Sequence, residues 1–319
     1  MDGKPITSSD QIIESAIRLA RIAGKKVVAV AGASDVDVLG ALASAHADGI
    51  LEAALFGEKN KIEKAADEGG IDISGLEIMP EADAAGAVYG AVKMAAEGRA
   101  DIIMKGFVST SALLKTVLSR DFSLRTKNLV SHTAVLDIPG YHKLLSMTDG
   151  GMVVRPNFDQ KIQIIENAVL VARALGLMPV RVAISGAFDQ VREDMPLTIE
   201  NSEIKARIEM GNMEDVVIQG PMTFDAATSA EVCRIKGITG PVAGQADIFV
   251  VNSIEECNII AKALINFVEA VFAGVIVGAR VPISLVSRTD TIKNKKASVS
   301  IACLVAEYYK QSGVMGGDQ

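Results

Sequence analysis

The chain has 319 residues, of which 49% are hydrophobic and 22% are charged, a composition that is typical of a folded protein and argues against disorder. A net charge of −7 and an aromatic content of 4%, with no tryptophan, argue against a nucleic-acid partner, because such binding surfaces need basic patches and stacking rings. The mean hydropathy of +0.31 is high, but the most apolar run, residues 270–279, is about half as long as a membrane-spanning helix, so we expect no membrane partner.

Helical and strand patterns alternate along the chain. Apolar residues recur at helical spacing over residues 8–23, and the β-branched run at 25–31 predicts a strand buried on both faces. In the first half we expect further helices at 35–47, 58–67 and 83–97, and further strands at 51–56, 76–79 and 101–104. In the second half we expect helices at 161–175, 200–210, 225–236, 254–269 and 295–309, and strands at 180–185, 215–218, 247–251, 271–277 and 281–286. This order predicts an α/β fold with mostly parallel sheets and helices on both faces.

One region interrupts the alternation between the two halves. Residues 131–137 and 143–148 are both strand-like and are separated by a short segment that contains Pro139 and Gly140. Proline followed by glycine between two strands at such short spacing predicts a β-hairpin. We place the first domain boundary close to this hairpin.

Cysteine and histidine spacing points away from cross-links and metals. The three cysteines are widely spaced along the chain: Cys233, Cys257 and Cys303. They form neither a CxxC pair nor a zinc pattern, and no two histidines have ligand spacing, so we expect neither disulfides nor a metal centre. The chain opens with the polar run MDGKPITSSD, which differs from a signal peptide. A reducing cytoplasm is therefore the expected location.

Ligands of open α/β sheets bind beyond the carboxyl ends of the strands, so the residues that follow each predicted strand are the first candidates. Lys105 and Gly106 follow one such strand, and Ser109, Thr110 and Ser111 come next, just before a helix begins. A cation, a flexible glycine and three hydroxyls at a helix N-terminus suit a phosphate group. The alternative is that Ser109 only caps the helix, and the sequence leaves both interpretations open.

A second candidate site follows the strand predicted at 281–286. There the chain continues with Ser287, Arg288 and Asp290. An arginine can hold phosphate in a bidentate fork, a serine can donate a hydrogen bond, and an aspartate can accept a proton. The alternative is a capped helix with a surface ion pair.

Two further positions carry weaker signals. Residues 32–35 match neither the G-x-G-x-x-G nor the P-loop pattern, so a nicotinamide dehydrogenase of the common type and a P-loop kinase both lose their main fingerprint. Asp35 is then expected to be an N-cap. His132, at the start of the first hairpin strand, either faces a binding cleft or is a satisfied core histidine.

Together these motifs resemble the phosphate acetyl/butyryl transferase family, and more closely its butyryltransferase members. Each segment alone is weak, but six of them run in family order and extend over most of the chain. They are residues 104–115 (MKGFVSTSALLK), 131–143 (SHTAVLDIPGYHK), 220–227 (GPMTFDAA), 241–247 (PVAGQAD), 258–262 (NIIAK) and 281–290 (VPISLVSRTD).

The resemblance implies two α/β/α domains similar to those of isocitrate and isopropylmalate dehydrogenases, with the active site in the cleft between them. The first domain would be discontinuous and comprise residues 1–138 and 281–319, and the second would be inserted and comprise residues 139–280. Family members are typically homodimers or larger, so we also expect a homo-oligomer.

The implied reaction converts an acyl-CoA and phosphate into an acyl phosphate and CoA, with CoA as a co-substrate and no bound cofactor. The resemblance assigns Arg288 to phosphate or acyl phosphate, and Ser287 to the thiol or the reacting oxygen. Acetyl-type members place a proposed base, an aspartate, seven residues after this serine, where the chain has Asn294, so Asp290 becomes the candidate base. Lys105 and the nearby hydroxyls are candidates for the phosphate site, as is Lys115, which could instead be a surface cation.

The sequence leaves open a second acyl substrate and two other classes of activity. Butyryl-CoA is the favoured substrate and acetyl-CoA is the alternative. A metal-dependent dehydrogenase on the same architecture would need a cluster of aspartates and a nucleotide site, and the sequence shows no such cluster at helical spacing. A non-catalytic protein that senses acyl-CoA or acyl phosphate would bind CoA without turnover.

Overall fold

The computed structural model describes residues 4–211 and 213–314, which divide into two compact units. Unit 1 comprises the chain up to Ser8 together with Leu129–Val271, and unit 2 comprises Ser9–Asn128 together with the chain from Phe272 onward. Both units combine strands and helices, as the alternating sequence pattern predicts.

The sheet of unit 2 is mostly parallel. Its strands follow the order β3 (Glu77–Pro80), β2 (Leu51–Gly57), β1 (Lys26–Ala31), β4 (Ile102–Lys105), β11 (Ile283–Ser284) and β10 (Val271–Val277). All neighbours are parallel except β10 and β11. The chain runs outward from β1 through β2 to β3 and then returns to the other side of β1 at β4. In doubly wound folds, ligands bind where the strand order reverses in this way.

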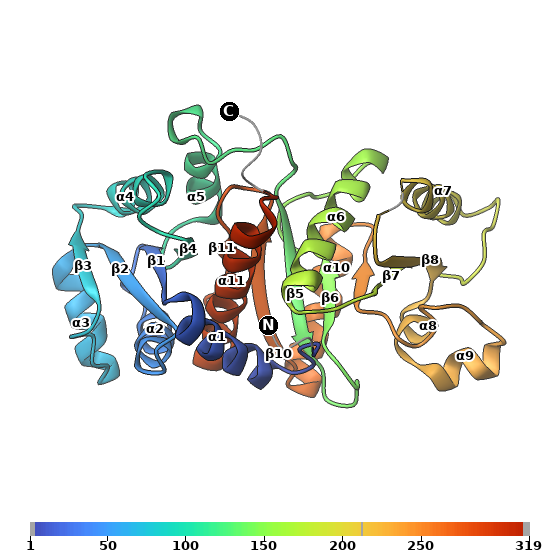
Figure 1. Ribbon diagram of the computed structural model, residues 1–319, viewed down its shortest axis with the longest axis horizontal. Helices are drawn as coiled ribbons and strands as arrows, with labels where there is room; N and C mark the ends of the chain where they lie inside the picture. The colour runs from blue at the N-terminus through green and yellow to red at the C-terminus, as the bar shows by residue number, and fades with distance from the viewer. Residues whose placement is uncertain (1–3, 212, 315–319) are drawn as a thin grey trace. The chain divides into compact units, whose positions relative to one another are not determined.

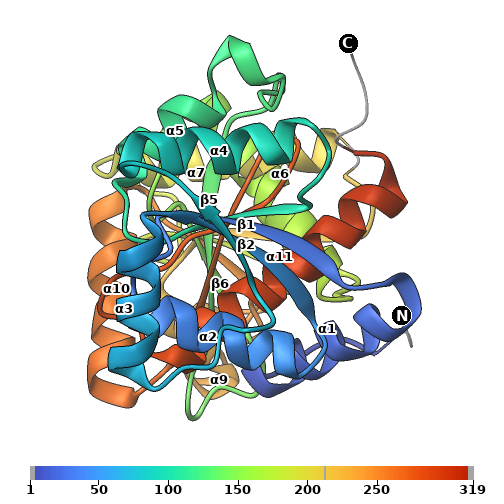
Figure 2. The same cartoon turned by 90° about the vertical axis from the view of Figure 1, so that its left-hand side faces the viewer.

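Helices cover both faces of this sheet. One face carries α4 (Ala84–Ala96) and α5 (Thr110–Val117), as both views show (Figures 1 and 2). The opposite face carries α1 (Ser9–Ala23), α2 (Val36–Ala47), α3 (Lys59–Gly69) and α11 (Ile292–Ser312). With helices on both sides, β1 and β4 are buried on both faces, which explains why each is apolar except for one terminal lysine.

The sheet of unit 1 follows the order β5 (Ser131–Asp137), β6 (Leu145–Thr148), β9 (Ile248–Val250), β7 (Val180–Ser185) and β8 (Val216–Met222). Its helices are α6 (Phe158–Ala174), α7 (Pro196–Met210), α8 (Phe224–Thr228), α9 (Ala230–Lys236) and α10 (Ile254–Val268). Only the β5–β6 pair is antiparallel among the paired strands of this unit, and it is the hairpin that the Pro-Gly segment predicts. The predicted α/β class with mostly parallel sheets is therefore confirmed.

Two predicted elements differ from the structure. The helix expected at 225–236 is two helices, α8 and α9, because the carbonyls of Ala226 and Ala227 accept hydrogen bonds from the N–H groups of Gly244 and Ala246 instead of continuing the helix. The strand expected at 281–286 is only the two-residue β11. Across residues 4–211 and 213–314, no helix has the length and apolar character that crossing a membrane requires.

Candidate active site

Two loops meet at the carboxyl ends of β1 and β4 in unit 2, where the strand order reverses. The N–H of Gly106 donates to the carbonyl of Ala31 at 2.9 Å, and the N–H of Phe107 donates to the carbonyl of Gly32 at 2.6 Å. A Cβ on Gly106 would lie 2.1 Å from the Gly32 carbonyl oxygen, so no larger residue fits there. Gly32 itself has a φ of +76°, which favours glycine. The two glycines therefore bring Lys105 and Phe107 close to the end of β1.

Lys105 ends β4 as a buried cation. Its Nζ donates to the carbonyl of Gly106 at 3.2 Å. Burial lowers the pKa of Lys105, and repulsion from Arg288 lowers it further, while Asp35 and Asp290 act in the opposite direction. The electrostatic coupling to Arg288 shows that the two predicted cations, which are far apart in the sequence, share one neighbourhood. The pairing of β4 with β11 explains this, because it places the ends of both strands side by side.

The predicted Ser287-Arg288 motif forms a tight turn between β11 and α11. The N–H of Ser287 donates to a carboxylate oxygen of Asp290 at 2.6 Å, and the N–H of Asp290 donates to the carbonyl of Ser287 at 3.2 Å. The Ser287 hydroxyl lies 3.2 Å from the Thr289 hydroxyl. Asp290 is buried, and its carboxylate orders the turn that presents Ser287 and Arg288.

Arg288 is exposed and lies over the ring of Phe107. Its Cζ is 4.6 Å from the ring centroid, within the range of a cation–π contact. Phe107 is itself 52% exposed. The sequence analysis did not single out Phe107, although it lies inside the predicted 105–111 loop, and an aromatic residue in a polar turn was the available signal.

Lys295 is a further cation that the sequence analysis missed. It is almost completely buried in the first turn of α11. Its Nζ donates to the main-chain carbonyl of Asp290 at 2.6 Å and lies 3.6 Å from a carboxylate oxygen of Asp37. Its charge also lowers the pKa of Lys105. A lysine inside an otherwise apolar helix face has no local sequence signal, so only the tertiary structure identifies it.

The remaining candidates of the 105–111 loop surround the start of α5. The Ser109 hydroxyl accepts a hydrogen bond from the N–H of Ala112 at 3.0 Å and is therefore the N-cap of this helix. Thr110 and Ser111 form its first turn, with Ser111 exposed. Lys115 is exposed in the last turn, at the opposite end of α5 from Ser109.

Asn294 and Asp35 have structural contacts. The Asn294 side chain is buried, and its carbonyl oxygen accepts a hydrogen bond from the N–H of Phe272 at 3.3 Å. Asp35 caps α2 by accepting a hydrogen bond from the N–H of Val38 at 2.9 Å, which confirms the predicted N-cap.

His132 is the one predicted site residue that belongs to unit 1. Burial lowers its pKa to about 4, so the imidazole is neutral near pH 7. The main-chain N–H of His132 donates to Asp149 at 3.2 Å, and the same carboxylate accepts hydrogen bonds from the main-chain N–H groups of Gly151, Met152 and Val153. His132 therefore lies beside a loop that a buried aspartate orders.

A buried polar network occupies the carboxyl ends of β7 and β9 in unit 1. The Nζ of Lys161 donates to Glu200 at 2.7 Å and to Asn252 at 3.0 Å. The Ser185 hydroxyl donates to Glu256, which also accepts the N–H of Asn252 at 2.8 Å. Lys161 is thus a buried cation with its charge compensated inside the protein.

Comparison with known proteins agrees with this geometry. Residues 81–303 match the family described as phosphate acetyl/butaryl transferase. The phosphate butyryltransferase of Clostridium beijerinckii is 39% identical over 289 residues, which cover 91% of this chain and 95% of that protein. The phosphate acetyltransferase of Rhizobium meliloti is 37% identical over 290 residues, with 91% and 92% covered. This chain belongs to the phosphate acetyl/butyryl transferase family.

A solved structure of related fold extends the comparison. The crystal structure of a branched-chain phosphotransacylase from Enterococcus faecalis V583 has a TM-score of 0.78 and 30% identity, and covers 88% of this chain and 99% of that one. The predicted family and the predicted transferase class are therefore confirmed.

Tyr141 and Lys143 in one family-like motif, and Asp247 in another, hold the unit 1 sheet together. The Nζ of Lys143 lies 2.5 Å from buried Asp247, and the other carboxylate oxygen of Asp247 accepts the N–H of Arg181 at 2.7 Å. The Tyr141 hydroxyl donates to the carbonyl of Ala246 at 2.7 Å. These contacts lie at the amino ends of β6, β7 and β9, away from the ligand-binding ends of the strands.

The cluster at the end of β4 and β11 is suited to an anion. Lys105, Arg288 and Lys295 supply positive charge, and the main-chain turn at 287–290 is held by Asp290. Such a cluster can bind phosphate and can stabilise negative charge on a reacting oxygen. Among the residues that the structure describes, no group of three or more His, Cys, Asp or Glu side chains could hold a metal ion.

Proposed function

We propose that this protein is a phosphate acyltransferase that interconverts an acyl-CoA plus phosphate with an acyl phosphate plus CoA. The observation that carries the proposal is that the positive charges of Lys105, Arg288 and Lys295 act on one another at the carboxyl ends of β4 and β11, in a chain that belongs to this family. Both reactants are anions, so the site has to offset their repulsion and hold phosphate beside the thioester.

In the proposed reaction, an oxygen of phosphate attacks the thioester carbonyl carbon. The new C–O bond forms, the C–S bond breaks, and CoA leaves as a thiolate that takes up a proton. Arg288 binds the phosphate, and the Ser287 hydroxyl donates to the carbonyl oxygen or to the sulfur. Lys105 and Gly106 contribute to the phosphate site, as do Ser109, Thr110 and Ser111 at the α5 N-terminus. Asp290 is the carboxylate closest in the chain to Ser287, and we assign it the proton transfer and the ordering of the turn.

The assay is thiol release from acyl-CoA with and without phosphate, together with trapping of the acyl phosphate as a hydroxamate. The proposal predicts phosphate-dependent thiol release and an equal amount of acyl phosphate. Absence of exchange with every acyl chain from C2 to C5 would contradict it. Binding of CoA without turnover would instead indicate a sensing protein.

Butyryl-CoA is the favoured substrate, and acetyl-CoA is the second candidate because relatives of both kinds are similar to this chain. Initial rates with acetyl-, propionyl-, butyryl- and isobutyryl-CoA decide between them. One methylene changes binding by about 1–3 kcal/mol, so a specific enzyme should show a clear maximum in kcat/KM.

Further elements of the proposal concern location and assembly. The three cysteines are free thiols, which is compatible with a reducing cytoplasm.

Ile259 and Phe267 on α10 are 70% and 86% exposed in the single chain. A subunit interface would bury these apolar side chains, which supports a homodimer or larger homo-oligomer. Light scattering during gel filtration should show the oligomer, and Phe267→Glu should weaken it. A monomeric wild-type protein at micromolar concentration would contradict this assignment.

A further inference from the structure

A buried lysine connects two loops of the candidate active site. Lys295 lies in the first turn of α11 and is only 1% exposed. Its Nζ donates to the main-chain carbonyl of Asp290 at 2.6 Å and lies 3.6 Å from a carboxylate oxygen of Asp37 in the first turn of α2. A buried charge is stable only where it is paired and hydrogen-bonded, so these two contacts hold the ammonium in place. One side chain therefore joins the turn after β11 to the start of the helix that follows β1.

The contact with Asp290 completes the ordering of the 287–290 turn. The N–H of Ser287 donates to the Asp290 carboxylate at 2.6 Å, and the N–H of Asp290 donates to the Ser287 carbonyl at 3.2 Å. Lys295 then holds the carbonyl at the end of the turn. Arg288 is exposed in the middle of this turn. The orientation of the exposed arginine therefore depends on main-chain contacts that a buried lysine completes.

The helices α2 and α11 are closely packed next to this turn. A Cβ on Gly40 of α2 would lie 3.1 Å from the Cδ1 of Ile292, so the glycine allows the first residue of α11 to approach α2. Lys296, the residue after Lys295, donates to Asp48 at the other end of α2 at 2.6 Å. The two neighbouring lysines thus bind opposite ends of the same helix, and Lys295 binds the end that lies next to the turn.

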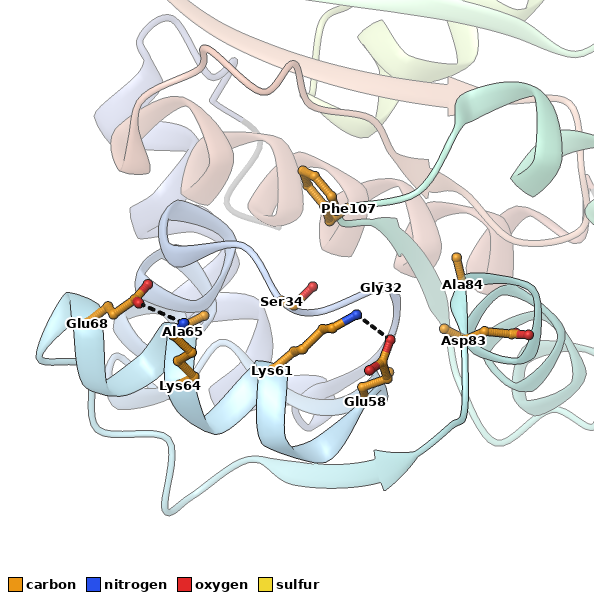
Figure 3. Close-up of a pocket in the computed structure, with 12 residues that line it drawn as sticks. Gly32, Ser34, Glu58, Lys61, Lys64, Ala65, Glu68, Asp83, Ala84 and Phe107 are labelled. Atoms are coloured by element: carbon orange, nitrogen blue, oxygen red, sulfur yellow. Dashed lines mark hydrogen bonds and ion pairs between the residues drawn. The ribbon is translucent and has the colours of Figure 1, made fainter.

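The loop between β1 and α2 has open space on one side. Gly32 and Ser34 of this loop line a cavity of about 590 Å³ together with Phe107 (Figure 3). Because open space borders the loop there, its position depends on the strand ends and on its contacts with α11. The ring of Phe107 also carries the Arg288 guanidinium, 4.6 Å from the ring centroid. Phe107 thus supports the arginine at its side chain, and Lys295 supports it at its main chain.

We propose that Lys295 is a positioning residue for the acyl transfer: it joins the 287–290 turn to α2 and so fixes the two side chains that meet the substrate. These are the Ser287 hydroxyl and the Arg288 guanidinium. The inference rests on the proposed function, because it names the residue that orders the groups of that site. Lys295 is buried, so it acts through Asp290 and not by contact with the substrate. Displacing a reacting group by about 1 Å can lower a rate about a hundredfold, so such ordering matters for turnover.

The first experiment separates positioning from simple attraction. Lys295→Met replaces the ammonium by a neutral side chain of similar length. Its kcat should fall about thirtyfold while KM for phosphate changes less than about threefold, because the loss concerns groups that act in the transition state. The matched control is Lys296→Met, in which both values should stay within about twofold of the wild type. A higher KM at unchanged kcat would assign Lys295 to attraction of the anion alone and would overturn the inference.

The second experiment tests whether Lys295 acts through the turn that carries Arg288. The kcat/KM values of Lys295→Met, Arg288→Ala and the double variant form a double-mutant cycle. The loss in the double variant should be at least about fivefold smaller than the product of the two single losses, because misplacing an absent guanidinium costs nothing. Losses that multiply fully would show that the two residues act independently and would contradict the inference.

A third measurement does not require turnover. Hydrogen–deuterium exchange of the peptide that covers residues 285–291 should be at least about tenfold faster in Lys295→Met and within about twofold of the wild type in Lys296→Met. Asp37→Asn removes the other end of the connection at a side chain that is 48% exposed, so the fold is kept even where Lys295→Met is unstable by urea unfolding. It should show faster exchange of the same peptide and a kcat about threefold lower.

The outcomes separate this inference from the proposed function. A wild-type protein without acyl transfer, but with faster exchange in Lys295→Met and Asp37→Asn, would reject the proposed function and uphold the connection. Acyl transfer at the wild-type rate together with unchanged exchange in both variants would reject the role of Lys295 alone.

Discussion

Buried lysines lie at the carboxyl ends of the parallel strands in both units, but the charges around them differ. In unit 1, Lys161 donates to Glu200 and Asn252, so its charge is compensated within the protein. In unit 2, burial lowers the pKa of Lys105, and the like charges of Arg288 and Lys295 lower it further, against the opposing effect of Asp35 and Asp290. A compensated cation stabilises a fold, whereas cations that repel one another are arranged for an anion that arrives from outside.

The largest expected effect concerns the exposed member of the unit 2 cluster. Arg288→Ala should lower kcat/KM for phosphate-dependent acyl transfer about a thousandfold, ~4 kcal/mol, because the bidentate partner of the phosphate is lost. The free energy of unfolding should change by less than about 0.5 kcal/mol, since the side chain is exposed. Steady-state kinetics and urea unfolding measure the two quantities.

Arg288→Lys is the matched control for this variant. It keeps the positive charge but loses the planar fork, so its kcat/KM should lie between those of the wild type and Arg288→Ala. Near-normal turnover in Arg288→Ala would contradict the assignment of the unit 2 cluster to anion binding.

The second prediction tests whether Lys161 stabilises the fold of unit 1. Lys161→Met should destabilise the protein by about 3 kcal/mol, because it leaves Glu200 and Asn252 without their shared donor. Urea unfolding followed by circular dichroism measures this loss. Lys205→Gln, which breaks the exposed pair with Glu209, should cost less than about 1 kcal/mol. If Lys161→Met keeps its stability but loses turnover, the unit 1 edge has a catalytic task and the comparison fails.

The third prediction uses the lowered pKa of Lys105. Below that pKa the amine is protonated and attracts phosphate, and as the pH rises through it the charge is lost. KM for phosphate should therefore increase about tenfold on the alkaline side, the value of one charge-assisted hydrogen bond. A pH series of initial rates measures this increase.

Two variants sharpen the assignment to Lys105. In Lys105→Arg the alkaline increase should disappear, because a guanidinium stays protonated throughout that range. In Lys105→Met, KM should be high at every pH. An unchanged alkaline increase in both variants would assign the titration to another group.

The smallest expected effect concerns Phe107. Phe107→Leu should raise KM for phosphate about threefold, since an exposed cation–π contact contributes ~0.5–1 kcal/mol to the placement of Arg288. Phe107→Tyr should keep the KM of the wild type, because the aromatic face is retained. Equal KM values in all three proteins, measured under the same conditions, would show that the ring does not position the guanidinium.

The candidate site was predictable where its residues share a short segment. Ser287, Arg288 and Asp290 follow one another, as do Lys105 and Gly106, and a glycine or a cation directly after a strand is visible in the sequence. Lys295 was not predictable, because it lies within a helix face and acquires its role only by contact with Asp290. Asp290 itself could be listed as a carboxylate but not as the acceptor of the Ser287 N–H.

The sequence by itself determined the order of strands and helices, the hairpin after residue 130 and the family, because periodicity, turn residues and motifs are local properties. Only the tertiary structure decided that Lys105 and Arg288 share one neighbourhood, since this requires β11 to pair with β4 across most of the length of the chain. It also decided the environment of His132, which lies in unit 1 beside Asp149. Long-range pairing depends on how whole elements pack, and no short segment of sequence contains that information.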